Sequence, residues 1–375
     1  MGKLKEITPK YCYNDVMIKP AVLSTINHRA ECDPFDKDGN LPLFTAPMDS
    51  VVGLENFELY EKHGIIPILP RTVGLKDRLS YAVNGKWAAF SLNEFEDEFT
   101  KGEKISSDNI KALIDMANGH MTRLYEDVRK AKRIYGGGLQ IMVGNIANPE
   151  TYRVCAESQV DFVRCSVGTG SGCTTCSNTG VGYPIASLIN EIAEIKAEMI
   201  ERGADESKLP KIIADGGIRC FRDITKSLAL GADYIMIGSV FSMMLESSAC
   251  KFCNSEDFLK LPLTVTVRDI ENAHLDSDGW RGKYNGKEIY LGDISARFYG
   301  MASRAGQIAL NGKKTRTSEG IEKTLPVLYT MSTWVDNFKD FLRSAMSYTN
   351  SKNLDDFRKS DVIVASANTV MSINA

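Results

Sequence analysis

The chain has 375 residues, of which 43% are hydrophobic and 25% charged, proportions that exclude a disordered or collagen-like protein. Lys and Arg number 45 and Asp and Glu 48, and this net charge of −3 argues against a protein that coats nucleic acid. No run of eighteen apolar residues occurs, so we expect no membrane span. The first six residues do not resemble a signal peptide and the nine cysteines are odd in number, so we expect free thiols in a reducing, cytoplasmic compartment.

Eight short apolar runs recur along the chain at fairly regular intervals. Each is too short for a helix and nearly continuous in apolar residues, which is typical of strands buried on both faces of a parallel sheet. The predicted strands are Leu43–Ala46, Ile65–Leu69, Trp87–Leu92, Ala112–Ala117, Leu139–Gly144, Phe162–Val167, Ile212–Ala214 and Tyr234–Gly238.

Helical patterns lie between several of these runs. Apolar residues repeat at helical spacing in Met121–Tyr135, Pro184–Gly203 and Phe221–Leu230, and each segment ends at or beside a glycine. Alternating strands and helices indicate a parallel α/β fold, and eight repeats favour a closed (β/α)₈, or TIM, barrel over an open sheet. We predict that residues 1–375 form a single domain of this fold.

Three segments depart from this rhythm. A loop rich in Gly, Ser, Thr and Cys, residues 166–182, lengthens the interval between the sixth and seventh strands. In a barrel it would lie at the carboxyl ends of the strands, where active sites are built. Residues 254–300 follow the eighth strand and are predicted to form an exposed appendage or hairpin. Residues 301–320 are mixed in character with a basic end, as in a mobile flap.

The 166–182 loop contains a candidate nucleophile. Glycines at 168, 170 and 172 let the backbone approach a ligand closely, and amides with nearby hydroxyls would stabilise a thiolate on Cys173. The alternative is a flexible surface loop with an incidental cysteine, and spacing alone does not decide between them. In the flap segment, Glu319 is a candidate acid or base, although a solvated surface glutamate is the default interpretation.

Two glycine-containing turns follow the seventh and eighth strands. They read Asp215-Gly216-Gly217 and Gly238-Ser239. Turns at these positions of a barrel commonly hold a phosphate, and an aspartate there would accept hydrogen bonds from ribose hydroxyls. Either turn alone could simply end a strand. Together with the Cys173 loop they suggest a nucleoside monophosphate whose base is delivered to Cys173.

Two Cys-x-x-Cys pairs, Cys173/Cys176 and Cys250/Cys253, raise the alternatives of a structural zinc or a dithiol redox site. The pairs are far apart in the chain, and both alternatives are disfavoured. None of the four histidines has a metal-ligand spacing, and His63 is predicted to end a helix before Gly64.

Several motifs form a specific combination when they are taken in chain order. They are Ala46-Pro47-Met48-Asp49-Ser50, Gly144-Asn145, Gly168–Thr175, Thr179–Pro184, Asp215–Gly217, Gly238-Ser239, Tyr299–Met301 and Ser318–Gly320. Together they resemble the IMP dehydrogenase/GMP reductase family, and the similarity extends from Asp15 to Lys359. The resemblance implies a (β/α)₈ barrel that is usually assembled as a homotetramer.

The resemblance also implies covalent chemistry, in which the Cys173 thiolate attacks C2 of a purine nucleotide. A reductase would expel ammonia from GMP and release IMP after hydride transfer from NADPH, whereas a dehydrogenase would oxidise IMP with NAD and hydrolyse the intermediate to XMP. Three features favour the reductase. The interval between Leu69 and Trp87 is too short for the regulatory CBS domains common in the dehydrogenase, the flap segment lacks an Arg-Tyr pair, and Gly182-Tyr183-Pro184 is closer to the reductase form.

Roles for individual residues follow from the same resemblance. Thr175 and Glu319 would act with Cys173 as catalytic residues and supply the proton that departing ammonia needs. The GMP or IMP nucleotide would contact Met48, Ser171, Asp215, Gly216, Gly217, Gly238, Ser239, Gly300, Met301, Ala302, Arg316, Thr317, Ser318 and Gly320. The cofactor NADPH would contact His28, Arg29, Arg71, Asp115, Met116, Ala117, Val167, Ser344, Ala345, Met346 and Ser347. Backbone carbonyls of Gly168, Gly170 and Cys173 would hold a monovalent cation, K⁺.

Five positions depart from the family pattern. Ser166 stands where the family usually has Gly, and Cys176 where Arg is usual. Ala302 replaces a serine of the reductase, and Pro70-Arg71 replaces a His-Lys pair, with Arg71 retaining a positive charge.

Overall fold

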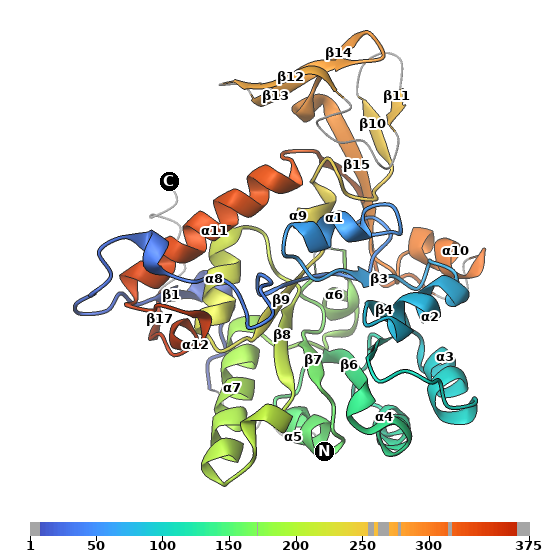
Figure 1. Cartoon of the computed structure of the whole chain (residues 1–375), viewed down its shortest axis with the longest axis vertical. Coiled ribbons are helices and arrows are strands. Elements are labelled where there is room, and N and C mark those ends of the chain that lie inside the picture. Colours follow the sequence, from blue (N-terminus) through green and yellow to red (C-terminus); the bar gives the residue numbers. More distant parts are fainter. Residues whose placement is uncertain are drawn as a thin grey trace.

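A closed barrel of eight parallel strands forms the centre of the molecule. The computed structural model describes residues 8–170, 172–253, 259–261, 270–276, 279–313 and 317–365. Eight strands form one sheet in the order β2-β9-β8-β7-β6-β5-β4-β3, and a parallel bridge from Phe44 to Ile66 joins its two ends (Figure 1). These strands are β2 Leu43–Thr45, β3 Ile68–Leu69, β4 Trp87–Phe90, β5 Ile110–Asp115, β6 Leu139–Ile146, β7 Phe162–Cys165, β8 Lys211–Asp215 and β9 Tyr234–Ile237.

Helices follow the barrel strands along the chain and cover the outside of the sheet (Figure 1). The principal ones are α1 Phe57–Lys62, α2 Leu75–Val83, α3 Leu92–Glu96, α4 Thr122–Tyr135, α5 Thr151–Glu157, α7 Ile185–Glu201, α8 Phe221–Ala229 and α11 Met331–Tyr348. Each predicted apolar run overlaps a barrel strand, and the three predicted helices correspond to α4, α7 and α8. The prediction of a (β/α)₈ barrel is therefore confirmed, and His63 caps the C-terminus of α1 as expected.

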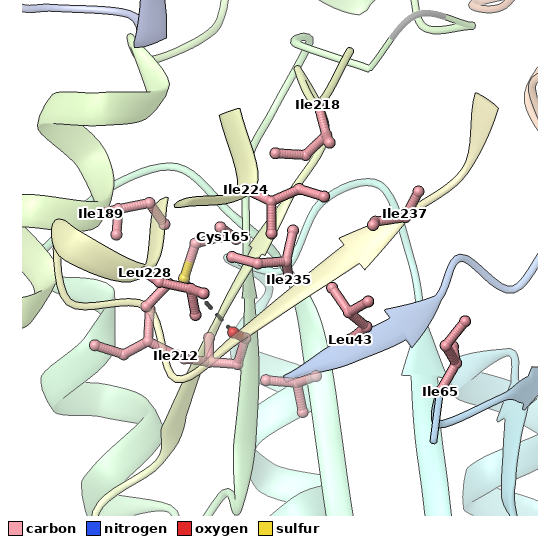
Figure 2. Packing of buried hydrophobic residues seen from close by; sticks show 14 of the residues in the cluster. Leu43, Ile65, Cys165, Ile189, Ile212, Ile218, Ile224, Leu228, Ile235 and Ile237 are labelled. Atoms are coloured by element: carbon pink, nitrogen blue, oxygen red, sulfur yellow. Dashed lines mark hydrogen bonds between the residues drawn. The ribbon is translucent and has the colours of Figure 1, made fainter. Parts of the chain in front are cut away.

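Two apolar layers stabilise the barrel. One lies between the sheet and the helices, where Ile212 of β8 and Ile235 of β9 lie near Leu228 of α8, and Leu43 of β2 lies toward Ile65 (Figure 2). The other fills the interior, where the rings of Phe44, Trp87 and Phe162 pack edge to face with centroids 5.1–6.1 Å apart. Because successive strand residues face opposite sides, both layers account for strands that are apolar throughout.

Two antiparallel sheets stand outside the barrel, between the eighth strand and α11 (Figure 1). A four-stranded sheet has the order β11-β10-β15-β16, and a three-stranded sheet the order β12-β13-β14. Their strands are β10 Lys251–Cys253, β11 Leu259–Leu261, β12 Glu271–Asp276, β13 Gly279–Tyr284, β14 Lys287–Tyr290, β15 Ile294–Tyr299 and β16 Glu322–Pro326.

These outer sheets are more extensive than the single hairpin considered for residues 254–300. Buried Leu245, Ile289, Ile294 and Val327 belong to an apolar cluster separate from those of the barrel. Residues 254–258, 262–269, 277 and 278 of the appendage lie outside the described part of the chain. The alternation of apolar and polar residues in β15 suits a strand that buries one face, which the search for continuous apolar runs does not detect.

Short elements complete the described chain. They are β1 Val16–Ile18, which pairs with β17 Val362–Val364, and helices α6 Thr175–Thr179, α9 Ser239–Ser242, α10 Arg304–Asn311 and α12 Leu354–Phe357. Short 3₁₀ turns occur at Tyr13–Asp15, Arg29–Glu31, Gly136–Gly138, Glu206–Lys208 and Leu291–Asp293, and Asp97–Lys101 forms a short π-helix. No helix among the described residues combines the length and apolar character that crossing a membrane requires.

Candidate active site

A cavity of about 280 Å³ opens at the carboxyl ends of the barrel strands. Its walls come from the loops after β2, β5, β7, β8 and β9, and from the segment that connects β15 to β16. In this fold the loops at this end of the barrel carry the active site. The cavity is therefore the candidate site, and its chemistry depends on which polar groups enter it.

Three side chains at the cavity form a continuous hydrogen-bond chain. The Cys173 thiol donates to Thr175 Oγ1 over 3.3 Å, and the Thr175 hydroxyl donates to Glu319 Oε2 over 2.9 Å. Cys173 and Thr175 lie two residues apart, whereas Glu319 comes from the segment before β16, 144 residues further along the chain. A thiol, a hydroxyl and a carboxylate in this order form a path along which a proton can move from sulfur to oxygen.

Backbone hydrogen bonds join the loop that contains Cys173 to the segment that contains Glu319. Cys173 and Gly320 form an antiparallel bridge, Thr174 N–H donates to Glu319 O over 3.0 Å, and Ile321 N–H donates to Gly172 O over 3.0 Å. A Cβ atom on Gly300 would lie 2.5 Å from Gly172 O, and one on Gly320 would lie 2.9 Å from the same oxygen. Glycine is therefore required where the loop and the flap segment meet.

A buried arginine organises the floor of the cavity. Arg164 Nη1 donates to Asp115 Oδ1 over 2.7 Å, and its Nη2 and Nε donate to Asp215 Oδ2 over 2.9 and 3.1 Å. Asn145 Nδ2 also donates to Asp215 Oδ2, over 2.7 Å. Burial alone would lower the pKa of Arg164, but the charges of Asp215 and Asp115 raise it above its ordinary value, so the guanidinium stays charged.

The strand period explains why these charged groups point into the barrel. Leu113, Phe162 and Ile213 belong to the interior cluster or pack against it. The charged residues Asp115, Arg164 and Asp215 each come two positions later on β5, β7 and β8, on the same face of the sheet. The floor of the cavity is thus the last layer of the barrel interior, with charges in place of apolar side chains.

A second polar contact joins the outer sheets to the rim of the barrel. The Tyr299 hydroxyl, at the end of β15, donates a short hydrogen bond to Asp49 Oδ2, just beyond the loop residue Met48 that lines the cavity. Burial raises the pKa of Asp49 above its ordinary value, although the hydrogen bond from Tyr299 opposes this shift. This contact fixes the start of the flap segment against the loop after β2.

The cavity brings together most of the residues that the sequence singled out. Those that line it are Met48, Arg71, Asp115, Met116, Ala117, Val167, Gly168, Gly170, Cys173, Thr175, Asp215, Gly216, Gly217, Gly238, Ser239, Gly300, Met301, Ala302 and Glu319. Gly320 meets the site through its bridge to Cys173, and Ser318 Oγ donates to Gly320 O over 3.1 Å. Thr317 is exposed and is not part of the lining. Ser171 and Arg316 lie outside the described residues.

One group of predicted cofactor residues lies apart from the cavity. His28, Arg29 and the segment 344–347 are not among its lining residues. They form a cluster of their own, in which the N-terminal segment lies against α11: Ser24 Oγ donates to Ser347 O over 2.8 Å, and Arg29 pairs with Asp340 over 3.1 Å. The structure therefore separates the predicted cofactor contacts into two groups.

Sequence reasoning missed the role of Arg164. A signal was present, because a charged residue inside the apolar run Phe162–Val167 is unusual for a strand buried on both faces. Asn145 belongs to a recognised motif but carried no assigned role. Phe298 and Leu310 also line the cavity, and nothing in their local pattern distinguishes them from core residues.

Comparisons with known proteins identify the family of the chain. The family model for the IMP dehydrogenase/GMP reductase domain matches residues 10–261. The chain belongs to the IMP dehydrogenase/GMP reductase family. It is 25% identical over 374 residues to a GMP reductase of Caenorhabditis elegans, covering 94% of this chain and 91% of that protein. It is 26% identical over 369 residues to a GMP reductase of Photobacterium profundum, covering 93% of each.

A relative with the other activity matches over a shorter region. An inosine-5'-monophosphate dehydrogenase of Borreliella burgdorferi is 31% identical over 250 residues, covering 66% of this chain and 52% of that protein. The family consists of oxidoreductases that act on GMP or IMP with a nicotinamide cofactor. Within the described residues, no group of three or more His, Cys, Asp or Glu side chains could hold a metal ion. Cys173 and Cys176 are among the residues searched.

Proposed function

We propose that the protein is a GMP reductase, which converts GMP to IMP and ammonia with NADPH as the reductant. The observation that carries this proposal is the hydrogen-bond chain from Cys173 through Thr175 to Glu319 at the edge of the cavity. Loss of an amino group from C2 of GMP needs a sulfur nucleophile, a route for the thiol proton and an acid for the departing nitrogen. The three side chains supply these in one line.

The chemical steps can be assigned to groups of the chain. Cys173 passes its proton to Thr175 while Thr175 passes one to Glu319, and the resulting thiolate bonds to C2 of GMP. Glu319 then returns a proton through Thr175 to the C2 amino group, which leaves as neutral ammonia. NADPH, when bound, supplies the hydride that C2 receives. The carbon–sulfur bond breaks as the thiolate leaves, and IMP is released.

The floor of the cavity suits a ribose phosphate. The hydrogen bonds that Asp215 accepts from Arg164 and Asn145 all reach its Oδ2, so in the described part of the chain its Oδ1 is left to accept a ribose hydroxyl. Gly216 and Gly217 have φ of +91° and +76°, a conformation that exposes backbone amides in the turn after β8. Together with Gly238 and Ser239 they are proposed to bind the phosphate.

Several of the residues proposed to contact a nicotinamide cofactor line the same cavity. Arg71 Nε is buried, and no hydrogen-bond partner for it occurs among the described residues, so a ligand acceptor would satisfy it. Asp115, Met116, Ala117 and Val167 also line the cavity. A single NADPH would reach Arg29 and Ser344–Ser347 as well only by extending out of the cavity, or from a neighbouring copy, which the proposed homotetramer would provide.

Backbone carbonyls of the 166–182 loop are proposed to hold K⁺. Gly168 has φ of +78°, and Gly170 O accepts a hydrogen bond from Cys173 N–H over 2.9 Å, so these residues form one tight turn. A carbonyl has two lone pairs, and Gly170 O therefore retains one for a cation. The cation would stabilise the turn that presents Cys173.

Oxidation of IMP by NAD is the second candidate, supported by the match to the Borreliella enzyme. Two observations favour the reductase: the GMP reductases match over more than nine tenths of both chains, and β3 and β4 are joined by the single nine-residue helix α2. Purified protein should consume NADPH, followed by its absorbance, only when GMP is present, and release ammonia in equal amount. NADH formation from IMP and NAD, with no turnover of GMP, would refute the proposal.

A further inference from the structure

The loop that contains Cys173 also contains a second thiol, Cys176, which has no role in the proposed reaction. Cys173 and Cys176 are both exposed, and both are free thiols. Cys173 lines the cavity and donates to Thr175, whereas Cys176 is not a lining residue. Cys176 replaces the arginine usual in the family, so it is a property of this chain.

The backbone between the two thiols has the shape of a tight turn. Thr174 has φ of −118° and ψ of 9°, and helix α6 begins at the next residue, Thr175. Residues three apart on backbone of this near-helical conformation have Cα atoms roughly 5 Å apart. Disulfides span Cα separations of about 4.4–6.8 Å, so Cys173 and Cys176 can be joined with little backbone movement.

Space around Cys176 is provided by two glycines. A Cβ atom on Gly168 would lie 2.3 Å from Cys176 Cβ, and one on Gly182 would lie 2.9 Å from Cys176 Sγ. The thiol therefore packs closely against glycine backbone on one side and faces solvent on the other. No bulky side chain of Gly168 or Gly182 stands between the Cys176 sulfur and the turn that it shares with Cys173.

We propose that Cys173 and Cys176 form a redox modification site, in which Cys176 is the resolving thiol for an oxidised nucleophile. The proton path to Glu319 that generates the Cys173 thiolate for catalysis also exposes it to peroxides. Hydrogen peroxide converts the thiolate to a sulfenic acid and is reduced to hydroxide. The Cys176 sulfur then attacks that sulfenic sulfur, and the hydroxyl group leaves with the Cys176 proton as water, forming the Cys173–Cys176 disulfide.

The disulfide has two consequences for the protein. It removes the nucleophile, so turnover stops until a dithiol reductant restores both thiols. It also consumes the sulfenic acid before a second peroxide can oxidise it irreversibly to sulfinic acid. The proposal goes beyond the reaction proposed above, because it depends on two thiols and not on which purine nucleotide is the substrate.

The test combines mass spectrometry with recovery of activity. The full-length protein, reduced and then treated with hydrogen peroxide, should lose about 2 Da, the mass of two hydrogens. The tryptic peptide of residues 165–196 should carry the link, and its fragmentation pattern separates a Cys173–Cys176 bond from one that involves Cys165. Cys176→Ser should instead gain about 32 Da at Cys173 and recover roughly fivefold less activity after dithiothreitol.

Matched variants make the result decisive. Cys176→Ser should retain its activity before oxidation, and Cys12→Ser, which removes another exposed thiol, should behave as the wild type throughout. Wild-type protein that forms sulfinic acid at Cys173 as fast as Cys176→Ser does, without a Cys173–Cys176 link, would overturn the proposal. Because the mass readout needs no substrate, a protein that fails to reduce GMP but forms the link refutes only the proposed function.

Discussion

The two sides of the active site are built from different kinds of structure. On the barrel side, Asp115, Arg164 and Asp215 stand at the ends of parallel strands and are held by a buried network of ion pairs. On the flap side, Glu319 belongs to the connection between two strands of an antiparallel sheet outside the barrel. The proposed nucleophile Cys173 lies between them, in a glycine-rich loop that bonds to the flap segment through backbone groups.

This difference indicates that the barrel side and the flap side of the site have different roles. Buried charges on rigid strands provide fixed donors and acceptors for a ligand, whereas a segment held mainly by backbone contacts around glycines can move without disrupting a core. We therefore expect changes on the flap side to reduce turnover with little loss of stability, and changes on the barrel side to affect both.

The largest expected effect is at the junction of the two sides. Cys173→Ser removes the proposed nucleophile, so kcat should fall on the order of 1,000-fold or more, while the proposed nucleotide contacts on the floor of the cavity are retained. GMP affinity, measured by calorimetry, should change by less than about threefold. Near-normal turnover would exclude covalent catalysis at this position.

On the flap side, Glu319→Gln retains the size of the side chain but removes its acid–base function. Turnover should fall about 100- to 10,000-fold, while the free energy of unfolding should change by less than about 0.5 kcal/mol. Stopped-flow measurement of ammonia release, compared with nucleotide binding, locates the affected step. A variant with unchanged kcat would remove Glu319 from the mechanism.

On the barrel side, Arg164→Met leaves two buried carboxylates without their cation. Loss of one partner from a buried ion pair costs about 3–5 kcal/mol, so urea denaturation should show destabilisation of this order together with weak nucleotide binding. The exposed pair Arg29–Asp340 is a matched control, because Arg29→Met should cost at most about 1 kcal/mol. Equal effects of the two substitutions would contradict the structural role assigned to Arg164.

The smallest expected effect is a pH dependence in the outer sheets. Lys251 is fully buried at the start of β10 and donates to Ser247 O and Ala249 O. Burial lowers its pKa from 10.5 to about 8, although the charge of Glu246 opposes this shift. Between these values the unfolded chain binds more protons than the folded one, so stability should rise with pH. From pH 7.5 to 9.5 the wild type should gain about 1–2 kcal/mol relative to Lys251→Met. Parallel curves for the two proteins would show that Lys251 does not titrate in this range.

The same contrast explains what could be predicted from the sequence. Barrel strands are buried on both faces, so runs such as Tyr234–Gly238 identify them directly. The strand β15 buries only one of its faces, and its partner β16 has a mainly polar sequence, so neither forms an apolar run. Within the site, local motifs indicated Cys173 and the glycine turns. The hydrogen bond from Thr175 to Glu319 depends on the path of the chain between them, which no local pattern encodes.

The hydrogen bond between Tyr299 and Asp49 joins the outer sheets to the loop after β2. The strand β15 that leads from the outer sheets ends at Tyr299, and Asp49 adjoins Met48 in the wall of the cavity. A displacement of β15 would therefore affect the wall of the cavity as well as the segment that contains Glu319. A shift of the outer sheets would in this way reach both walls of the cavity through one phenol–carboxylate contact.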